Sequence, residues 1–298
     1  MLEQLTTERR NPNTMELDEW STRAIIEKMN QEDLCTIQAV KEQLPAIEAV
    51  IEQAIQCMKQ NGRIIYVGAG TSGRIGMLDA VECPPTFGMD PNRVIGVLAG
   101  EDTAMFAKEE AEDHYEYGQE KMKQLHITKQ DLVIGLAASG RTPYVIGALD
   151  YAKAQQATTA SIACNKHAEL SKHADYVIEL DNGPEIVTGS TRLKAGTSQK
   201  MVCNMITTAT MIRLGKVYEN LMVDVDVSNE KLYARWLNIV KTATGCDEQV
   251  AKVMYEKSKH NAKIAICMIL LDYDYEQAEQ ALKKANGFVK EVIKKKEV

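Results

Sequence analysis

Short apolar runs alternate with longer amphipathic segments through the middle of the chain. The five runs cover residues 63–67, 93–98, 131–137, 157–163 and 175–180. Continuous apolar runs of this length are typical of strands buried on both faces of a sheet, and the segments between them have helical periodicity. The alternation therefore predicts a doubly wound parallel sheet of five strands with helices on both faces.

Helical patterns flank this predicted sheet on both sides in the sequence. Two helices are predicted near residues 16–30 and 33–60, and Pro45 indicates that the second is either two helices or one kinked helix. Residues 194–214 predict one long apolar-rich helix. Shorter helices should follow, with breaks at residues 245–247, 272–274 and 286–287.

These patterns divide the chain into three expected parts. They are an N-terminal helical extension over residues 1–54, a sheet domain over residues 55–218 and a small helical C-terminal domain over residues 219–298. The first 15 residues are polar, and their pattern predicts irregular structure.

Composition restricts the class of protein. The 298 residues are 45% hydrophobic and 26% charged, which is typical of a globular protein. A net charge of −7 argues against a nucleic-acid partner, which requires a basic face. No apolar run approaches the ~18 residues of a membrane span, and the N-terminus has no signal-like run. We therefore expect a cytoplasmic protein with no membrane or nucleic-acid partner.

The seven Cys and five His do not form a recognisable metal motif. The cysteines are widely spaced without a CxxC pair, and no two histidines have HExxH spacing. The sequence therefore predicts neither a disulfide framework nor a metal site.

The first apolar run is followed by a loop rich in glycine and hydroxyl groups. The loop contains Gly68, Gly70, Thr71, Ser72, Gly73 and Arg74. A buried strand that turns into a helix through such residues exposes backbone N–H groups to an anion. The three glycines also have dinucleotide-fingerprint spacing, but no acidic residue ends a second strand about 20 residues further on, where a ribose would need one. A phosphorylated ligand is therefore favoured over a dinucleotide.

The third run leads into a second loop of the same kind, made of Ser139, Gly140, Arg141, Thr142 and Pro143. The proline suits the first turn of a helix, and either hydroxyl residue can cap that helix. Two hydroxyls, a guanidinium and free N–H groups suit a phosphate dianion. One such loop is more often a plain capped helix, but two loops on parallel strands favour a ligand at one sheet edge.

A third polar cluster follows the fifth run and opens the long helix. Glu185, Ser190, Arg192 and Lys194 lie close together there in the sequence. We expect some of them to line the same site, although a lone Lys or Arg at such a place is usually solvated.

Two acidic segments are candidates for acid–base chemistry. Glu82 precedes Cys83, Pro84 and Pro85, which predict a rigid turn that could hold a general acid or base. A loop glutamate in water fits the same residues equally well. The acidic run at 109–113 is expected on a helix, where a charge run is usually a solvated face, and its spacing selects no member.

Together these segments resemble the N-acetylmuramic acid 6-phosphate etherase family of the sugar isomerase (SIS) superfamily. The matching segments are residues 68–74, 82–86, 137–143 and 184–197, together with 220–224 and 238–246. The resemblance extends over nearly the whole chain. It implies an α/β fold, namely a flavodoxin-like three-layer α/β/α SIS domain, and a homodimer with sites near the subunit interface. It implies no metal and no organic cofactor.

The resemblance also implies a reaction and its residues. The family cleaves the D-lactyl ether of N-acetylmuramic acid 6-phosphate, and this carbon–oxygen lyase reaction belongs to amino-sugar recycling from peptidoglycan. The family's two catalytic glutamates fall on Glu82 and Glu112. The implied substrate-binding residues are Gly70, Thr71, Ser72, Ser139, Gly140, Arg141, Thr142, Glu185, Ser190 and Lys194.

Two other functions share part of this pattern. An aldose–ketose isomerase of the same superfamily resembles this chain in its phosphate loops, and its base matches Glu185, but it has no ether oxygen that Glu82 would protonate. A sensor similar to the glucokinase regulatory protein binds a sugar phosphate without catalysis, but that protein is longer and contains two such domains. A transcription regulator would add a helix-turn-helix with a basic face, which is not visible here.

Overall fold

A parallel five-stranded sheet forms the centre of the computed structural model, which describes residues 5–100, 109–227 and 229–296. Its strands are β1 (Ile64–Gly68), β2 (Val94–Leu98), β3 (Leu132–Ala137), β4 (Thr158–Ala163) and β5 (Tyr176–Glu179). They pair in the order β2-β1-β3-β4-β5, and every neighbouring pair is parallel. This is the flavodoxin-like order, so the predicted sheet is confirmed.

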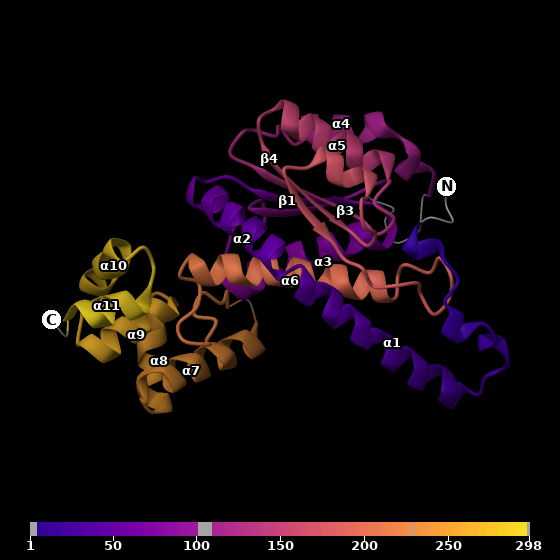
Figure 1. The fold of residues 1–298 in the computed structure, drawn as a ribbon. Helices are drawn as coiled ribbons and strands as arrows, with labels where there is room; N and C mark the ends of the chain where they lie inside the picture. The colour runs from indigo at the N-terminus through magenta and orange to yellow at the C-terminus, as the bar shows by residue number, and fades with distance from the viewer. Residues whose placement is uncertain (1–4, 101–108, 228, 297–298) are drawn as a thin grey trace. The chain divides into compact units, whose positions relative to one another are not determined.

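Helices cover both faces of this sheet and make three layers (Figure 1). On one face lie α4 (Tyr115–Gln124) and α5 (Pro143–Ala154), and on the other lie α2 (Leu44–Lys59), α3 (Gly70–Phe87) and α6 (Lys194–Arg213). Successive strand residues point to opposite layers because the side-chain period of a strand is two. Ile65 packs in the core beneath α5, whereas the Tyr66 hydroxyl donates to the Cys203 carbonyl of α6 at 3.3 Å. The predicted three-layer arrangement is confirmed.

The two N-terminal helices are divided at a different place from the one expected. Helix α1 (Thr22–Glu42) runs without a break through residues 31–32, and α2 begins directly after Gln43. Pro45 therefore occupies the first turn of a new helix, where its missing N–H leaves no intrahelical hydrogen bond unmade. The boundary expected at residues 31–32 was wrong because the polar pattern of α1 continues across it, whereas the two-helix alternative at Pro45 is confirmed.

Several short 3-10 turns complete the described backbone. They are η2 (Thr6–Glu8), η3 (Pro12–Thr14), η4 (Leu17–Glu19), η6 (Glu109–Asp113) and η7 (Glu169–His173).

The C-terminal region is helical, as expected. It contains α7 (Glu230–Thr244), α8 (Glu248–Lys257), α9 (Ala262–Leu271), α10 (Tyr275–Lys284) and α11 (Val289–Lys296), packed around the fully buried Trp236. The three expected breaks are confirmed. A fourth, between α8 and α9, was missed because it is made by Lys259 and His260 with positive φ rather than by glycine.

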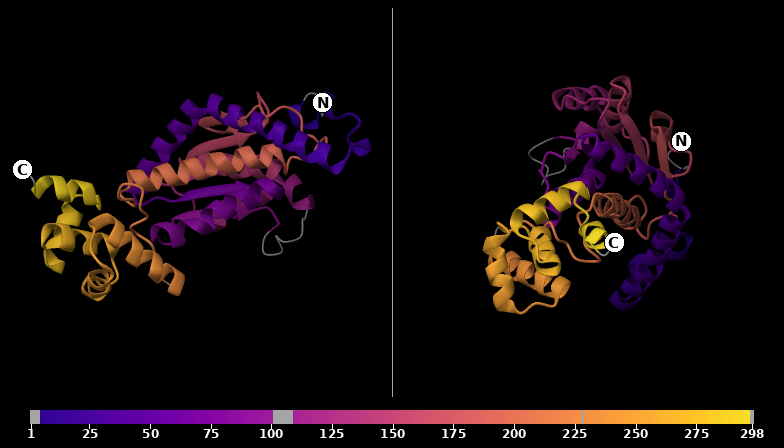
Figure 2. Two further views of the ribbon diagram at one scale, coloured as in Figure 1. Left: turned by 90° about the horizontal axis from the view of Figure 1, so that it is seen from below. Right: turned by 90° about the vertical axis from the view of Figure 1, so that its left-hand side faces the viewer.

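The chain forms two compact units by its internal contacts. The first extends to Val81 and includes Asn92–Thr207, and the second combines Glu82–Pro91 with the chain from Thr208 onward. Figure 2 shows α6 between α3 and the N-terminal helices, and side-chain hydrogen bonds join α6 to both. The domain boundaries expected at residues 54 and 218 stay a prediction. No helix among the described residues is both long enough and apolar enough to cross a bilayer.

Candidate functional site

The two predicted anion loops lie at the carboxyl ends of neighbouring strands. Gly68 at the end of β1 is in register with Leu136 near the end of β3. The chain then continues into α3 below the sheet and into α5 above it (Figure 1). The two connections therefore diverge at the switch point of the sheet, which is where ligands bind in folds of this class.

The first loop is joined to α6 by its serine. Gly70 opens α3 with a φ of 51° and Thr71 is half-buried, close to Gly196 of α6. The buried Ser72 hydroxyl donates to the Gln199 Oε1 atom at 2.8 Å. We expected the Ser72 hydroxyl to donate to a phosphate, but in this structure it donates to α6 instead. Ser72 can donate to an anion only after the hydroxyl or the amide rotates.

The second loop presents a helix N-terminus. Thr142 occupies the N-cap position of α5, but its side chain makes no capping hydrogen bond. The expectation that a hydroxyl caps α5 is therefore wrong for Thr142, while Pro143 lies in the first turn as predicted. Ser139 is half-buried and Arg141 is exposed. The positive end of the α5 helix dipole lies at this loop and favours an anion there, although Pro143 has no N–H and the Val145 N–H donates to the Thr142 carbonyl at 3.1 Å.

Backbone geometry explains the glycine of this second loop. Gly140 has a φ of 70°, and an added Cβ would lie 2.4 Å from the Cβ of Ala168. Its carbonyl accepts the Leu170 N–H at 2.8 Å, so the loop is fixed on both sides. Glycine is therefore required here both by conformation and by space.

We expect Gly140→Ala to lower the free energy of unfolding by more than the ~1–2 kcal/mol of left-handed backbone strain, and to weaken sugar phosphate binding. The matched control is Gly245→Ala, because Gly245 has a φ of 71° with nothing within 4 Å of an added Cβ. Urea denaturation and calorimetric titration with a hexose 6-phosphate would measure the two effects. Equal losses of stability in the two variants, with unchanged binding, would contradict this account of the loop.

Glu185 caps the N-terminus of α6. Its carboxylate is 1% exposed and accepts the backbone N–H groups of Lys194 at 3.0 Å and Ala195 at 2.9 Å. Burial raises the pKa of Glu185, and these two hydrogen bonds oppose the rise. A carboxylate at this end of a helix is also stabilised by the helix dipole. Both oxygens thus have a structural partner.

Lys194 forms an internal ion pair. The side chain is buried, and its Nζ atom lies 2.9 Å from the Glu32 carboxylate of α1. Burial alone would raise the pKa of Glu32, but its contacts with Lys194, Lys28 and Asn11 outweigh burial and lower that pKa. The predicted contacts of Lys194 and of the half-buried Ser190 with substrate stay predictions.

The N-terminal segment has a role that the sequence analysis missed. Thr7, Asn11 and Thr14 are buried. Asn11 donates to the Pro184 carbonyl at 3.3 Å, and the Thr14 hydroxyl donates to the Ile186 carbonyl at 3.0 Å. Hydrogen bonds from this irregular segment therefore hold the backbone on both sides of Glu185, in the third polar cluster, in place.

The same segment also reaches the second loop through a residue after β4. The Asn165 amide donates to Thr7 Oγ1 at 3.1 Å and to the carbonyls of Ala138 at 3.1 Å and Ser139 at 3.3 Å. The Asn11–Pro12 pair was a usable signal, because the Asn11 side chain caps the η3 turn by accepting the Asn13 N–H.

The two candidate catalytic glutamates lie on different elements. Glu82 is exposed on α3. The prediction of a rigid turn after Glu82 is wrong, because Pro84 and Pro85 lie within the last turns of this helix. Glu112 is half-buried in the η6 turn rather than on the expected helix.

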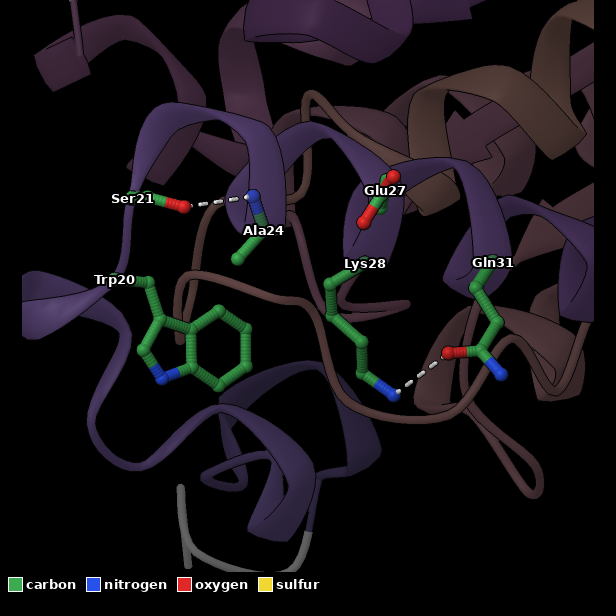
Figure 3. Close-up of a pocket in the computed structure, with 6 residues that line it drawn as sticks. All are labelled: Trp20, Ser21, Ala24, Glu27, Lys28 and Gln31. Atoms are coloured by element: carbon green, nitrogen blue, oxygen red, sulfur yellow. Dashed lines mark hydrogen bonds between the residues drawn. The ribbon is translucent and has the colours of Figure 1, made fainter.

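A separate shallow groove lies at the start of α1 (Figure 3). It has a volume of about 620 Å³ and is lined by Trp20, Ser21, Ala24, Glu27, Lys28 and Gln31. None of the predicted site residues lines it. Within the described ranges, no three His, Cys, Asp or Glu side chains are grouped so that they could hold a metal ion.

Comparison with family models first defines the class of the protein. Residues 46–153 match the N-terminal SIS domain of glucokinase regulatory protein, and residues 109–209 match the SIS domain. Residues 219–266 match the C-terminal lid domain of glucokinase regulatory protein. A solved structure from Bacteroides fragilis, proposed to be a phosphosugar isomerase involved in capsule formation, has the same fold. It is 18% identical, with a TM-score of 0.51, over 67% of this chain and 95% of that one.

Comparison with curated proteins then gives the family. N-acetylmuramic acid 6-phosphate etherase from Exiguobacterium is 54% identical over 98% of this chain and 100% of its own length. Proteins of that name from Enterococcus faecalis and Bacillus cereus are each 53% identical over 98% of this chain and over 99% and 100% of their own. The chain therefore belongs to the N-acetylmuramic acid 6-phosphate etherase family.

Proposed function

We propose that this chain is a carbon–oxygen lyase that cleaves the D-lactyl ether of N-acetylmuramic acid 6-phosphate. The products are N-acetylglucosamine 6-phosphate and D-lactate, and the reaction serves amino-sugar recycling from peptidoglycan. The observation that carries this proposal is the 54% identity to a named etherase over 98% of the chain. The uncapped helix N-terminus and exposed guanidinium of the second loop support a phosphorylated substrate.

Elimination explains how an ether can be cleaved under mild conditions. Direct hydrolysis is slow because an alkoxide is a bad leaving group. Opening of the sugar ring exposes an aldehyde at C1, which makes the C2 proton acidic. Removal of that proton allows lactate to leave from C3 as its C–O bond breaks, and water then adds to the resulting unsaturated aldehyde.

We assign one glutamate to each proton transfer in this sequence. Glu112 removes the C2 proton as general base, and Glu82 protonates the departing ether oxygen and later activates the water. No metal or organic cofactor is needed for these steps.

We assign phosphate binding to the switch-point edge of the sheet. Ser139, Gly140, Arg141 and Thr142 would contact the phosphate, with Gly70, Thr71, Ser72, Ser190 and Lys194 in reach. A phosphate held away from C3 can orient the reacting atoms through binding energy alone.

Glu185 weighs against the isomerase alternative. The resemblance matches this residue to the base of aldose–ketose isomerases, yet here both carboxylate oxygens accept N–H groups of α6. We therefore give Glu185 a supporting role beside the substrate.

A substrate comparison would test the proposed function. Purified protein is incubated in parallel with N-acetylmuramic acid 6-phosphate and with N-acetylglucosamine 6-phosphate, and lactate and ketose phosphate are measured. We expect lactate from the first and no ketose from either. Ketose formation without lactate would indicate an isomerase, and binding without any product would indicate a sensor.

We also propose that the enzyme is a cytoplasmic homodimer. Large apolar side chains are exposed on one side of α1, where Ile26 is 53%, Leu34 63% and Ile37 56% exposed. Leu78 and Val81 of α3 are similarly exposed. A second copy of the chain would cover such residues. All seven cysteines are free, which suits a reducing compartment.

Ile37→Glu is expected to convert the dimer into a monomer, because it places a charge within the apolar side of α1. Light scattering coupled to size-exclusion chromatography would measure the mass. The matched control is Val253→Glu on α8, where the valine is 43% exposed. A wild-type protein that is monomeric at micromolar concentration would contradict the proposed dimer.

A further inference from the structure

The helix that carries Glu82 has a weakened C-terminal end. Pro84 and Pro85 lie inside α3 and have no N–H, so the two carbonyls four residues earlier lose their intrahelical hydrogen bonds. The helix ends at Phe87, and Gly88 closes it by donating its N–H to the Pro84 carbonyl at 2.8 Å. Because its own hydrogen bonds are depleted, this end needs contacts from outside the helix to hold Glu82 at a fixed position.

Such a contact is made at Gly88 by the backbone of Asp224. A Cβ added to Gly88 would lie 2.2 Å from the Asp224 carbonyl oxygen and 3.6 Å from the Asp224 Cβ atom. Gly88 also has a φ of 55°. The chain around Asp224 therefore packs directly against the residue that terminates α3, and both segments belong to the second compact unit. They line one groove of about 870 Å³ together with Pro84, Lys216 and Lys263.

Asp224 is in turn fixed by two lysines from different elements. Its Oδ2 atom lies 3.0 Å from Nζ of Lys216, which follows α6, and 2.8 Å from Nζ of Lys263, in the first turn of α9. The side chains of Asp224 and Lys263 are only 12% and 10% exposed. Val223 and Val225, which flank Asp224 in the sequence, are buried in the core of the C-terminal helices. Asp224 thus joins the end of α3 to that core.

We propose that Asp224, clamped by Lys216 and Lys263, is a positioning residue for Glu82. This inference rests on the proposed function and extends it. The carboxylate fixes its own backbone, that backbone supports Gly88, and Gly88 ends the helix on which Glu82 stands. The step that depends on the clamp is protonation of the ether oxygen as the C3–O bond breaks. Removal of the C2 proton by Glu112 does not depend on it.

The two steps can be measured separately in one reaction. In D2O, deuterium at C2 of recovered N-acetylmuramic acid 6-phosphate reports removal and return of the C2 proton, and D-lactate reports the elimination. For Asp224→Asn in the full-length chain we expect lactate release to fall about 100-fold, because small displacements of a catalytic group have effects of this size. Deuterium incorporation at C2 should persist, so the ratio of exchange to elimination rises.

Two further variants distinguish positioning from general damage. Gly88→Ala disturbs the same contact from the opposite side and should raise the same ratio, which keeps the test valid if Asp224→Asn does not fold. Val289→Ala removes buried volume from the core of the C-terminal helices, since Val289 is 2% exposed, without touching the clamp. It should lower the unfolding midpoint but leave the ratio unchanged. Asp224→Glu keeps the charge and should restore part of the lactate release.

A parallel fall of exchange and elimination in Asp224→Asn, matched by Val289→Ala, would overturn the inference and leave the proposed function intact. So would unchanged lactate release in Asp224→Asn. A wild-type protein that performs neither reaction would overturn the proposed function itself and with it this inference.

Discussion

Glu112→Gln is expected to abolish exchange of the C2 proton while sugar phosphate binding persists. The amide has almost the same shape as the carboxylate but does not accept a proton, so a loss of at least about 100-fold is expected for removal of a general base. Deuterium incorporation from D2O, followed by mass spectrometry, measures the exchange. Calorimetric titration measures the binding.

The matched control for this variant is Asp113→Asn, which changes an exposed carboxylate of the same turn. It should leave both exchange and binding unchanged. Exchange at the wild-type rate in Glu112→Gln would remove Glu112 from the role of base.

Glu82→Gln is expected to give the complementary result. The variant retains the base, so C2 exchange should continue, while lactate release should fall about 100-fold or more because the ether oxygen departs without a proton. Lactate can be measured with a coupled dehydrogenase and C2 deuterium by mass spectrometry in the same sample.

The control for Glu82 is Glu120→Gln, an exposed carboxylate on α4. Should Glu82→Gln lose both C2 exchange and lactate release while sugar phosphate binding persists, Glu82 would be the base and the two roles would be reversed. Loss of both activities together with loss of binding would indicate that Glu82 holds the substrate.

The architecture could be predicted from the sequence because its signals are local. The continuous apolar run at Ile64–Gly68 fits only an element buried on both faces, and the glycine and hydroxyl residues after it indicate where the strand ends. The same reasoning placed β3 and the Ser139–Thr142 loop. Their meeting at one sheet edge then follows from parallel topology alone.

Proline was predicted well at one place and not at another, because its effect depends on its position in an element. Pro45 indicated either two helices or one kinked helix, and the two-helix alternative is confirmed, since α2 begins directly before it. Pro84 and Pro85 were expected to form a turn, but they lie within α3. Local preference disfavours these last two positions, so contacts distant in sequence must hold them in the helix. The Asp224 backbone against Gly88 is one such contact.

The electrostatics of the candidate site could not be predicted because the partners lie far apart in the sequence. Lys194 pairs with Glu32, which is 162 residues away. Ser72 donates to Gln199 across 127 residues. Asn11 lies in a polar N-terminal segment, and a polar pattern gives no sign of burial. The structure shows that the residue is buried.

The most direct test of the central claim is one incubation of the wild-type protein with N-acetylmuramic acid 6-phosphate in D2O enriched in oxygen-18. Elimination followed by addition of water predicts unlabelled D-lactate, with oxygen-18 at C3 and deuterium at C2 of the N-acetylglucosamine 6-phosphate. Oxygen-18 in the lactate would show that the bond on the lactyl side of the ether is cleaved. That result, or the absence of lactate, would contradict the account.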